Sequence, residues 1–266
     1  MISTLSRIIN KVLGLFGLCL RRVKSSGSWS HQRSPELLHS RLTPSATYSP
    51  WLSDPEFLDA YELIKSHTLV DLYRCYELWD QAQQSCTVGG SILEVGVWRG
   101  GTGCLLAIAA RQKTVYLADN FEGVVKAGEH DTGYVGGEHA DTSALVVENL
   151  LASAKVNNAQ LLKGIFPDQT ADAVEGTISL LHVDVDVYRS AQETVLWALP
   201  RMPLGARIVF DDYGFFGCEG VTRLVNELRN QLSDWAFVYN LNGHAIFIRI
   251  SPGEAPVSPP SVAPHR

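Results

Sequence analysis

A short apolar run that breaks into glycines most constrains how this chain can fold. Residues 91–103, SILEVGVWRGGTG, begin as a strand, pass through four closely spaced glycines, and lead into an apolar helix over residues 104–111. Strand, glycine-rich turn and helix form the opening unit of nucleotide-binding α/β folds, because glycines allow tight turns and the helix N-terminus offers free N–H groups. We therefore expect a doubly wound, Rossmann-like α/β sheet.

The second strand narrows the choice of ligand. Residues 114–119 read as a strand ending at Asp119, and an acid there can accept hydrogen bonds from both ribose hydroxyls of an adenosine. The spacing from Glu94 to Gly101 departs from the G-x-G-x-x-G pattern of dinucleotide loops, and a glutamate would repel a pyrophosphate. Glu94 suits S-adenosylmethionine, which carries an amino-acid group and a sulfonium cation. The alternative is an ordinary strand-to-helix turn.

Strand and helix patterns then alternate, as a parallel sheet requires. The expected strands cover residues 160–166, 178–186, 206–212, 235–239 and 245–250, the last two as an antiparallel pair, and the expected helices cover residues 144–155, 190–199 and 217–232. Apolar residues at helical spacing predict one or two further helices within residues 54–84. Tyr73 and Arg74 on this stretch could reach the site, although core or surface roles are favoured for both. The predicted core domain is therefore residues 51–250.

The two ends of the chain differ from this core. Residues 1–50 read as an amphipathic segment followed by a linker, and residues 251–266 as a disordered, proline-rich tail. The apolar part of residues 1–22 is too short to span a bilayer. Peripheral membrane contact, packing on the core or a partner, and an export signal are the alternatives for this segment.

Composition limits the partners and the compartment. The formal net charge of −6 argues against a nucleic-acid partner. Five cysteines without metal-ligand spacing suggest reduced thiols in a cytoplasmic protein, membrane-associated if residues 1–22 bind lipid. We expect a small-molecule or glycan substrate and a homo-oligomer.

Carboxylates end four of the expected strands. They are Glu94, Asp119, Asp184 with Asp186, and Asp211 with Asp212. Because ligands of open parallel sheets bind outside the carboxyl ends of the strands, these acids should converge. Asp184, Asp211 and Asp212 would repel one another unless a hard cation such as Mg²⁺ lay between them. That cation would lower the pKa of a coordinated hydroxyl, and Asp184 is the candidate proton acceptor. The alternative is solvated acids or helix caps, which we expect for Asp168 and Asp186.

A long loop follows the second strand. Residues 121–143 are rich in Gly, Asp, Glu and His and are expected to form an active-site lid. A metal cluster of its acids and histidines, or His139 as a general base, are weaker alternatives.

Four motifs in this order resemble one known family. Residues 94–101 (EVGVWRGG), 118–123 (ADNFEG), 182–190 (HVDVDVYRS) and 209–214 (VFDDYG) are similar to those of the macrocin O-methyltransferase family. Its members are S-adenosylmethionine- and Mg²⁺-dependent enzymes that methylate sugar hydroxyls on macrolides and aminocoumarins. The resemblance, over residues 69–250, implies cofactor contacts at Glu94, Gly96, Gly101 and Asp119. It also implies metal contacts at Asp184, Asp211 and Asp212, with Asp184 as the base.

The sequence therefore predicts an S-adenosylmethionine- and divalent-metal-dependent O-methyltransferase that acts on a hydroxyl of a sugar or glycosylated natural product. On the same two loops we also expect cofactor contacts from Trp98, Thr102 and Asn120. Asn120 stands where the family usually has serine, and Val185 where it usually has glycine, and both differences bear on the substrate. An NAD-dependent oxidoreductase and a non-catalytic binding protein on the same fold are the alternatives.

Overall fold

The computed structural model describes residue 37 and residues 46–252. All the helices and strands described below belong to the compact unit of residues 42–266. The expected amphipathic segment (residues 1–22), most of the linker after it and all but the first two residues of the expected tail lie outside the described residues.

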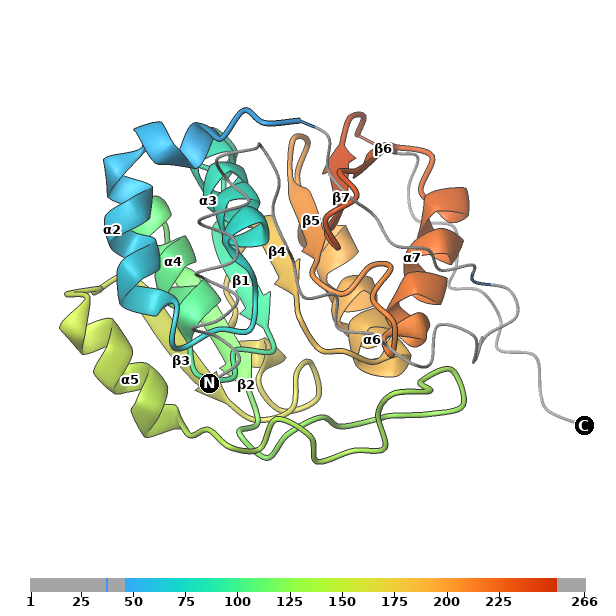
Figure 1. Ribbon diagram of the computed structural model, residues 1–266. Coiled ribbons are helices and arrows are strands. Elements are labelled where there is room, and N and C mark those ends of the chain that lie inside the picture. Colours follow the sequence, from blue (N-terminus) through green and yellow to red (C-terminus); the bar gives the residue numbers. More distant parts are fainter. Residues whose placement is uncertain (1–36, 38–45, 253–266) are drawn as a thin grey trace, which may run out of the picture. The chain divides into compact units, whose positions relative to one another are not determined.

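A seven-stranded mixed sheet forms the centre of the described residues (Figure 1). Its strands are β1 (Ser91–Val95), β2 (Val115–Asp119), β3 (Ala159–Lys163), β4 (Ile178–Val183), β5 (Arg207–Phe210), β6 (Trp235–Tyr239) and β7 (Ala245–Arg249). They lie in the order β3-β2-β1-β4-β5-β7-β6, with β1 to β5 parallel and β7 antiparallel to both β5 and β6. The doubly wound fold and the antiparallel closing pair are confirmed.

Helices cover both faces of this sheet (Figure 1). One face is covered by α2 (Pro55–Ile64), α3 (Leu72–Ser85), α4 (Gly101–Ala109) and α5 (Ala144–Ser153), and the other by α6 (Tyr188–Ala198) and α7 (Glu219–Gln231). Short 3₁₀ turns occupy Pro50–Ser53, Ala171–Ala173 and Leu199–Arg201. The expected helices ahead of the sheet are therefore confirmed as α2 and α3.

Alternation along the strands separates two apolar cores. In β1, Ile92 packs with the α2–α5 side, whereas Leu93 and Val95 pack with the α6–α7 side. Glu94 has the same parity as Ile92, so the strand's pleat turns its carboxylate toward the α3–α4 face. Every residue of β4 is buried, as expected for a central parallel strand.

Several boundaries differ from the expected ones by one to three residues, and two of the largest differences have local reasons. Helix α4 begins at Gly101 rather than residue 104, because Gly100 adopts a left-handed conformation (φ 86°) that ends the loop earlier. Strand β3 ends at Lys163 rather than residue 166, because its only neighbour, β2, ends at the paired residue Asp119. Residues 121–143 contain no helix or strand and form the expected loop.

No helix within the described part of the chain is both long and apolar enough to cross a membrane.

The turn from α4 to β2 gives a test of the fold. The side-chain amide of Asn158 donates to the carbonyl oxygens of Ala107, Ala110 and Lys113 at 3.1, 3.2 and 3.0 Å. Asn158→Ala leaves these carbonyls without that donor, and we expect the free energy of unfolding to fall by about 1–3 kcal/mol. Urea unfolding followed by circular dichroism measures the change. The exposed neighbour Asn157→Ala is the control, and an equal effect of both changes would contradict the assignment.

Candidate functional site

The carboxyl ends of the parallel strands open into a pocket of about 330 Å³. Its walls are the loop after β1, the end of β2, the lid, and the segments that follow β4 and β5. Strands β2 and β4 lie on opposite sides of β1, so the chain reverses its direction across the sheet at this point. The pocket therefore lies where open α/β sheets bind ligands.

The loop after β1 is tight enough to require glycine at Gly96. Its φ is 90°, and a Cβ at this position would lie 1.7 Å from the carbonyl oxygen of Asp184. Asp119 holds the loop, because its Oδ2 accepts hydrogen bonds from the backbone N–H groups of Val97 and Trp98 at 2.7 and 2.8 Å. The acid at the end of β2 thus fixes the shape of the loop and also lines the pocket.

The structure gathers most of the residues expected to contact a cofactor. Gly96, Trp98, Thr102, Asp119 and Asn120 line the pocket. Gly101 is outside this lining, and its backbone N–H donates to the carbonyl oxygen of His67 at 3.0 Å. Glu94 is also outside it: the carboxylate is fully buried and accepts a hydrogen bond from His182 Nδ1 at 2.8 Å. Glu94 is therefore held in the core by His182, and its contact with a cofactor stays a prediction.

The expected acidic cluster does assemble. Asp184, Asp211 and Asp212 offer oxygen atoms that lie within 4.8 Å of one another. The parallel pairing of Val183 with Phe210 sets the ends of β4 and β5 level, so the residues that follow them meet. Burial, and then the charges of neighbouring carboxylates, raise the pKa of both Asp184 and Asp212 well above its ordinary value.

These three acids fit a hard divalent cation. The set of ligand atoms is all oxygen, as Mg²⁺ prefers. Oδ2 of Asp212 is buried and has no hydrogen-bond partner among the described residues. A buried carboxylate oxygen without a donor is costly, and a cation beside it would remove that cost.

Asp211 differs from its two neighbours because it has cationic partners. Its Oδ1 lies 3.0 Å from His244 Nε2, and its Oδ2 forms an ion pair with the buried guanidinium of Arg74. Burial alone would raise the pKa of Asp211, but the hydrogen bond from His244 and the charge of Arg74 lower it to about 2. Asp211 is therefore held as an anion.

Three residues at this site were not among the predicted contact residues. Arg74 lines the pocket, which was the less favoured of its two expected positions. Its Nε also donates to Asp71 at 2.9 Å. Glu77, one turn further along α3, lies 2.8 Å from His244 Nδ1. His244 directly precedes β7 and Asp211 directly follows β5, so the two meet only because β7 pairs with β5.

The lid reaches the acidic edge through Tyr134. Its hydroxyl donates to Asp186 Oδ1 at 2.6 Å, and His139 Nε2 lies 3.9 Å from Asp186 Oδ2. Burial, and then the charge of Asp186, raise the pKa of Tyr134, so its hydroxyl stays protonated. Tyr134, His139 and Asp186 all line the pocket.

Asp168 and Asp186 were expected to be solvated or to cap helices, and neither caps a helix. Asp168 is half-exposed and forms an ion pair with Lys126 at 2.7 Å. The carboxylate of Asp186 accepts a hydrogen bond from Tyr134 and makes no cap at Val187, the residue before α6. The backbone N–H of Tyr188, in the first turn of α6, is instead bound by Asp131 of the lid at 2.8 Å. The lid is thereby tied to the helix that follows β4.

Comparisons with known proteins agree with this geometry. The sequence model of the macrocin O-methyltransferase family matches residues 54–249. A demethyldecarbamoylnovobiocin O-methyltransferase of Streptomyces niveus is 30% identical over 56% of this chain, which spans 63% of that protein's length, less than two thirds. A mycinamicin III 3''-O-methyltransferase of Micromonospora griseorubida is 28% identical over 62% of this chain and 71% of its own.

Solved structures share the fold. The O-methyltransferase NovP has a TM-score of 0.61 and 24% identity over 70% of this chain and 83% of its own. An O-methyltransferase from Bacillus cereus, in complex with S-adenosylhomocysteine, has a TM-score of 0.51 and 16% identity over 76% of this chain and 96% of its own. Both are methyltransferases with the same class of sheet.

Removing the guanidinium of Arg74 tests how Asp211 is stabilised. Arg74→Met leaves a buried anion without one of its partners, and we expect the free energy of unfolding at pH 7 to fall by about 3–5 kcal/mol. Chemical unfolding followed by tryptophan fluorescence measures the loss. Arg223→Met removes a half-exposed i,i+4 pair with Glu227 and should cost about 0.5 kcal/mol or less. Equal losses in the two variants would refute the role of Arg74.

Neutralising Asp212 should raise the stability of the metal-free chain, whereas removing Arg74 lowers it. Because its pKa is raised by folding, the chain loses stability as the pH rises from the ordinary aspartate value through the raised one. In EDTA at pH 8 we expect Asp212→Asn to melt a few degrees higher than the wild type, the shift that about 1 kcal/mol gives in a domain of this size. The gain should vanish at acid pH, where Asp212 is protonated in both states. The exposed Asp172→Asn is the control, and a lower melting temperature for Asp212→Asn in EDTA would contradict the electrostatics.

Proposed function

The chain belongs to the macrocin O-methyltransferase family, and from this premise we propose that it transfers a methyl group from S-adenosylmethionine to a sugar hydroxyl of a glycosylated small molecule, with help from a divalent cation. The observation that carries the proposal is one pocket that combines a glycine-rich loop with three converging carboxylates. Both the novobiocin and the mycinamicin relatives are named as O-methyltransferases, which supports methyl transfer to an oxygen atom.

The cofactor wall would be the loop after β1 together with the end of β2. Gly96 lets the backbone come close to a ligand, and Thr102 lies in the first turn of α4, whose N-terminus offers free N–H groups. Asp119 holds the loop through Oδ2, and its Oδ1, which accepts from the backbone N–H of Phe121, has one lone pair left for a ribose hydroxyl. Asn120 would line the same side, with its amide donating to the carbonyl oxygen of Gly123 at 3.0 Å. S-adenosylmethionine supplies an activated methyl group on a sulfonium, which the acceptor oxygen displaces.

The acidic wall would orient the acceptor. Asp184, Asp211 and Asp212 would hold Mg²⁺ or a similar ion, which lowers the pKa of a bound acceptor hydroxyl. Arg74 and His244 keep Asp211 ionised and fixed in position. Since methyl transfer is an in-line displacement, fixing the acceptor oxygen toward the cofactor wall supplies much of the rate.

Asp184 would accept the proton of the acceptor hydroxyl. It lines the pocket at the end of β4, level with the loop after β1, because its backbone N–H donates to the carbonyl oxygen of Val95 at 2.9 Å. Burial and neighbouring carboxylates raise its pKa while no cation is bound, and a carboxylate in this position can take the proton of the acceptor hydroxyl directly or through water. The lid residues Tyr134 and His139 would close the acceptor side of the pocket.

Other expectations stay predictions. Peripheral membrane contact through residues 1–22 concerns a segment outside the described residues. A homo-oligomer, a cytoplasmic location and the boundaries of the three chain segments are likewise untested. We favour the transferase over an oxidoreductase or a non-catalytic protein, because either alternative leaves the converging acids unexplained.

Calorimetric titration with S-adenosylhomocysteine, in Mg²⁺ and in EDTA, tests the proposal. We expect micromolar binding of the nucleotide by the wild type and by Asp184→Asn. Mg²⁺ itself should bind the wild type and bind Asp184→Asn at least about tenfold more weakly, because one of three ligands is lost. Methyl transfer from labelled S-adenosylmethionine to a panel of glycosides should then require Mg²⁺ and be lost in Asp184→Asn.

Two results would overturn parts of the proposal separately. If the wild type binds no S-adenosylhomocysteine, the cofactor assignment fails. If it binds the nucleotide and transfers methyl groups equally well in EDTA, the metal part of the proposal fails, and Asp184 acts as the base without a cation. Asp172→Asn, an exposed change of the same charge, should behave as the wild type in every titration.

A further inference from the structure

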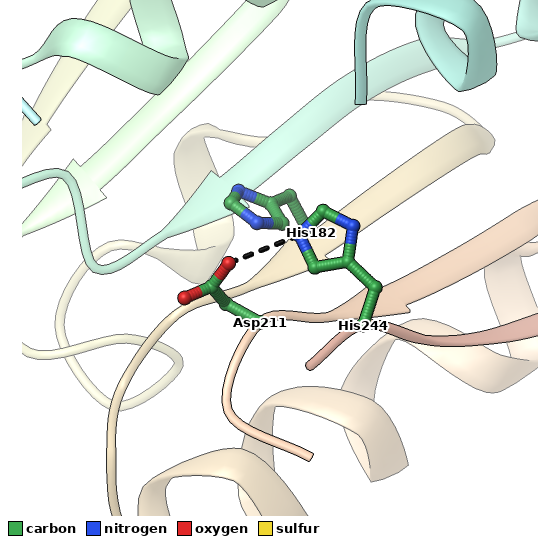
Figure 2. A group of neighbouring side chains, drawn as sticks. All are labelled: His182, Asp211 and His244. Atoms are coloured by element: carbon green, nitrogen blue, oxygen red, sulfur yellow. Dashed lines mark hydrogen bonds and ion pairs between the residues drawn. The ribbon is translucent and has the colours of Figure 1, made fainter. Parts of the chain in front are cut away.

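A second group of potential metal ligands shares Asp211 with the acidic cluster. It consists of His182 on β4, His244 before β7 and Asp211 after β5, and one ligand atom from each lies within 4.8 Å of the others (Figure 2). Both histidines are fully buried and Asp211 is nearly so. Figure 2 shows the two rings and the carboxylate meeting from three neighbouring strand ends. Unlike the acidic cluster, this group contains nitrogen.

Each imidazole has a glutamate on its Nδ1. His182 Nδ1 lies 2.8 Å from Glu94 Oε1, and His244 Nδ1 lies 2.8 Å from Glu77 Oε2. A carboxylate accepts and cannot donate, so each ring carries its proton on Nδ1 at that contact. The Nε2 atoms are thereby directed inward, in the tautomer that a metal-binding histidine uses when a carboxylate orients it.

The inward nitrogen of His182 has nothing to bind. Its Nε2 is buried and has no hydrogen-bond partner among the described residues. The other inward nitrogen, His244 Nε2, lies 3.0 Å from Asp211 Oδ1. Two ligands of one tetrahedral Zn²⁺ ion, each bound at about 2.0–2.2 Å, lie roughly 3.3–3.6 Å apart, so a shift of a few tenths of an ångström would bring these two atoms to ligand spacing. An unpartnered lone pair thus faces a pair of atoms that is close to ligand spacing.

The surrounding charge favours a cation. Glu77, Glu94 and Asp211 bring three carboxylates to this group, against the guanidinium of Arg74 and, while no metal is bound, the proton of His244. Buried anions in such excess need compensation by protons or metal ions. Two imidazole nitrogens and one carboxylate oxygen select a divalent first-row transition ion over Mg²⁺, which prefers oxygen.

We propose that His182, His244 and Asp211 form a buried site for a divalent transition metal ion, represented by Zn²⁺, with Glu94 and Glu77 orienting the two imidazoles. Asp211 would be shared by this site and the acidic cluster in the pocket. The ion would fix Asp211 and neutralise part of the charge at the sheet edge. The proposal does not depend on methyl transfer, since its ligands and its test are independent of the cofactor.

Metal binding by the purified full chain tests this site. After chelator treatment, the protein is titrated with Zn²⁺ in a large excess of Mg²⁺, so that the all-oxygen cluster is occupied by Mg²⁺. We expect one Zn²⁺ per chain in the wild type. His182→Asn and His244→Gln should each weaken binding by about a hundredfold or more, and Glu77→Gln by about tenfold to a hundredfold, because it only orients a ligand. S-adenosylhomocysteine binding, measured on the same samples, reports separately on the proposed function.

Controls separate a metal from a proton and from misfolding. His130→Gln changes a lid histidine outside the three ligands and should bind Zn²⁺ as the wild type does. Circular dichroism checks each variant, and if the buried histidine variants fail to fold, the X-ray absorption spectrum of Zn²⁺-loaded wild type decides. That spectrum should show scattering from two imidazoles. Three results would each overturn the site: no Zn²⁺ uptake in the presence of Mg²⁺, uptake unchanged in folded His182→Asn and His244→Gln, or a spectrum without imidazole scattering. In that case a proton on His244, and not a metal ion, compensates the charge of Asp211.

Discussion

Several acidic side chains lie together at one edge of the sheet, and the surrounding structure has to compensate their negative charge. Parallel strands direct their carboxyl ends to the same edge, so acids far apart in the sequence are brought together wherever the strands end in them. Burying an anion costs several kcal/mol unless it is paired or hydrogen-bonded. Arg74, His182 and His244 lie under the edge as partners for these acids, and the helix α3 that carries Arg74 packs against β4 and β5.

The acids were predictable from the sequence because their position depends on topology alone. Once the strand order is known, Asp184, Asp211 and Asp212 must meet, whatever the details of packing. Their partners depend on tertiary register. His244 meets Asp211 because β7 runs antiparallel to β5 with Ala245 opposite Phe210, which sets the preceding and following residues side by side. No local sequence pattern predicts that register.

Glu94 shows what strand alternation adds to a motif. The motif predicts a cofactor contact for Glu94, and alternation adds that Glu94 shares its parity with Ile92 and turns toward the α3–α4 face, where β4 presents His182 in register. Alternation is visible in the residues of β1 and β4 themselves, so the sequence carries a signal for this pair. A cap of α6 by Asp186 is absent for a different reason: Asp131 of the lid binds the N–H of Tyr188 at the start of α6, and loop paths of this length do not follow from sequence periodicity.

The acids at this edge fall into two groups, those with a cationic or imidazole partner and those without one. Glu94, Glu77 and Asp211 each have a cation or an imidazole within hydrogen-bond distance. Their charges are therefore compensated by contacts that hold this edge of the sheet together. Asp184 and Asp212 have no cation or imidazole within hydrogen-bond distance among the described residues, and burial, followed by the charges of neighbouring carboxylates, raises the pKa of both. Strain of this kind lowers stability and is retained where it serves a ligand. The chemistry of the pocket should therefore depend on the two carboxylates that folding leaves unsatisfied, while the satisfied ones give those two a rigid frame.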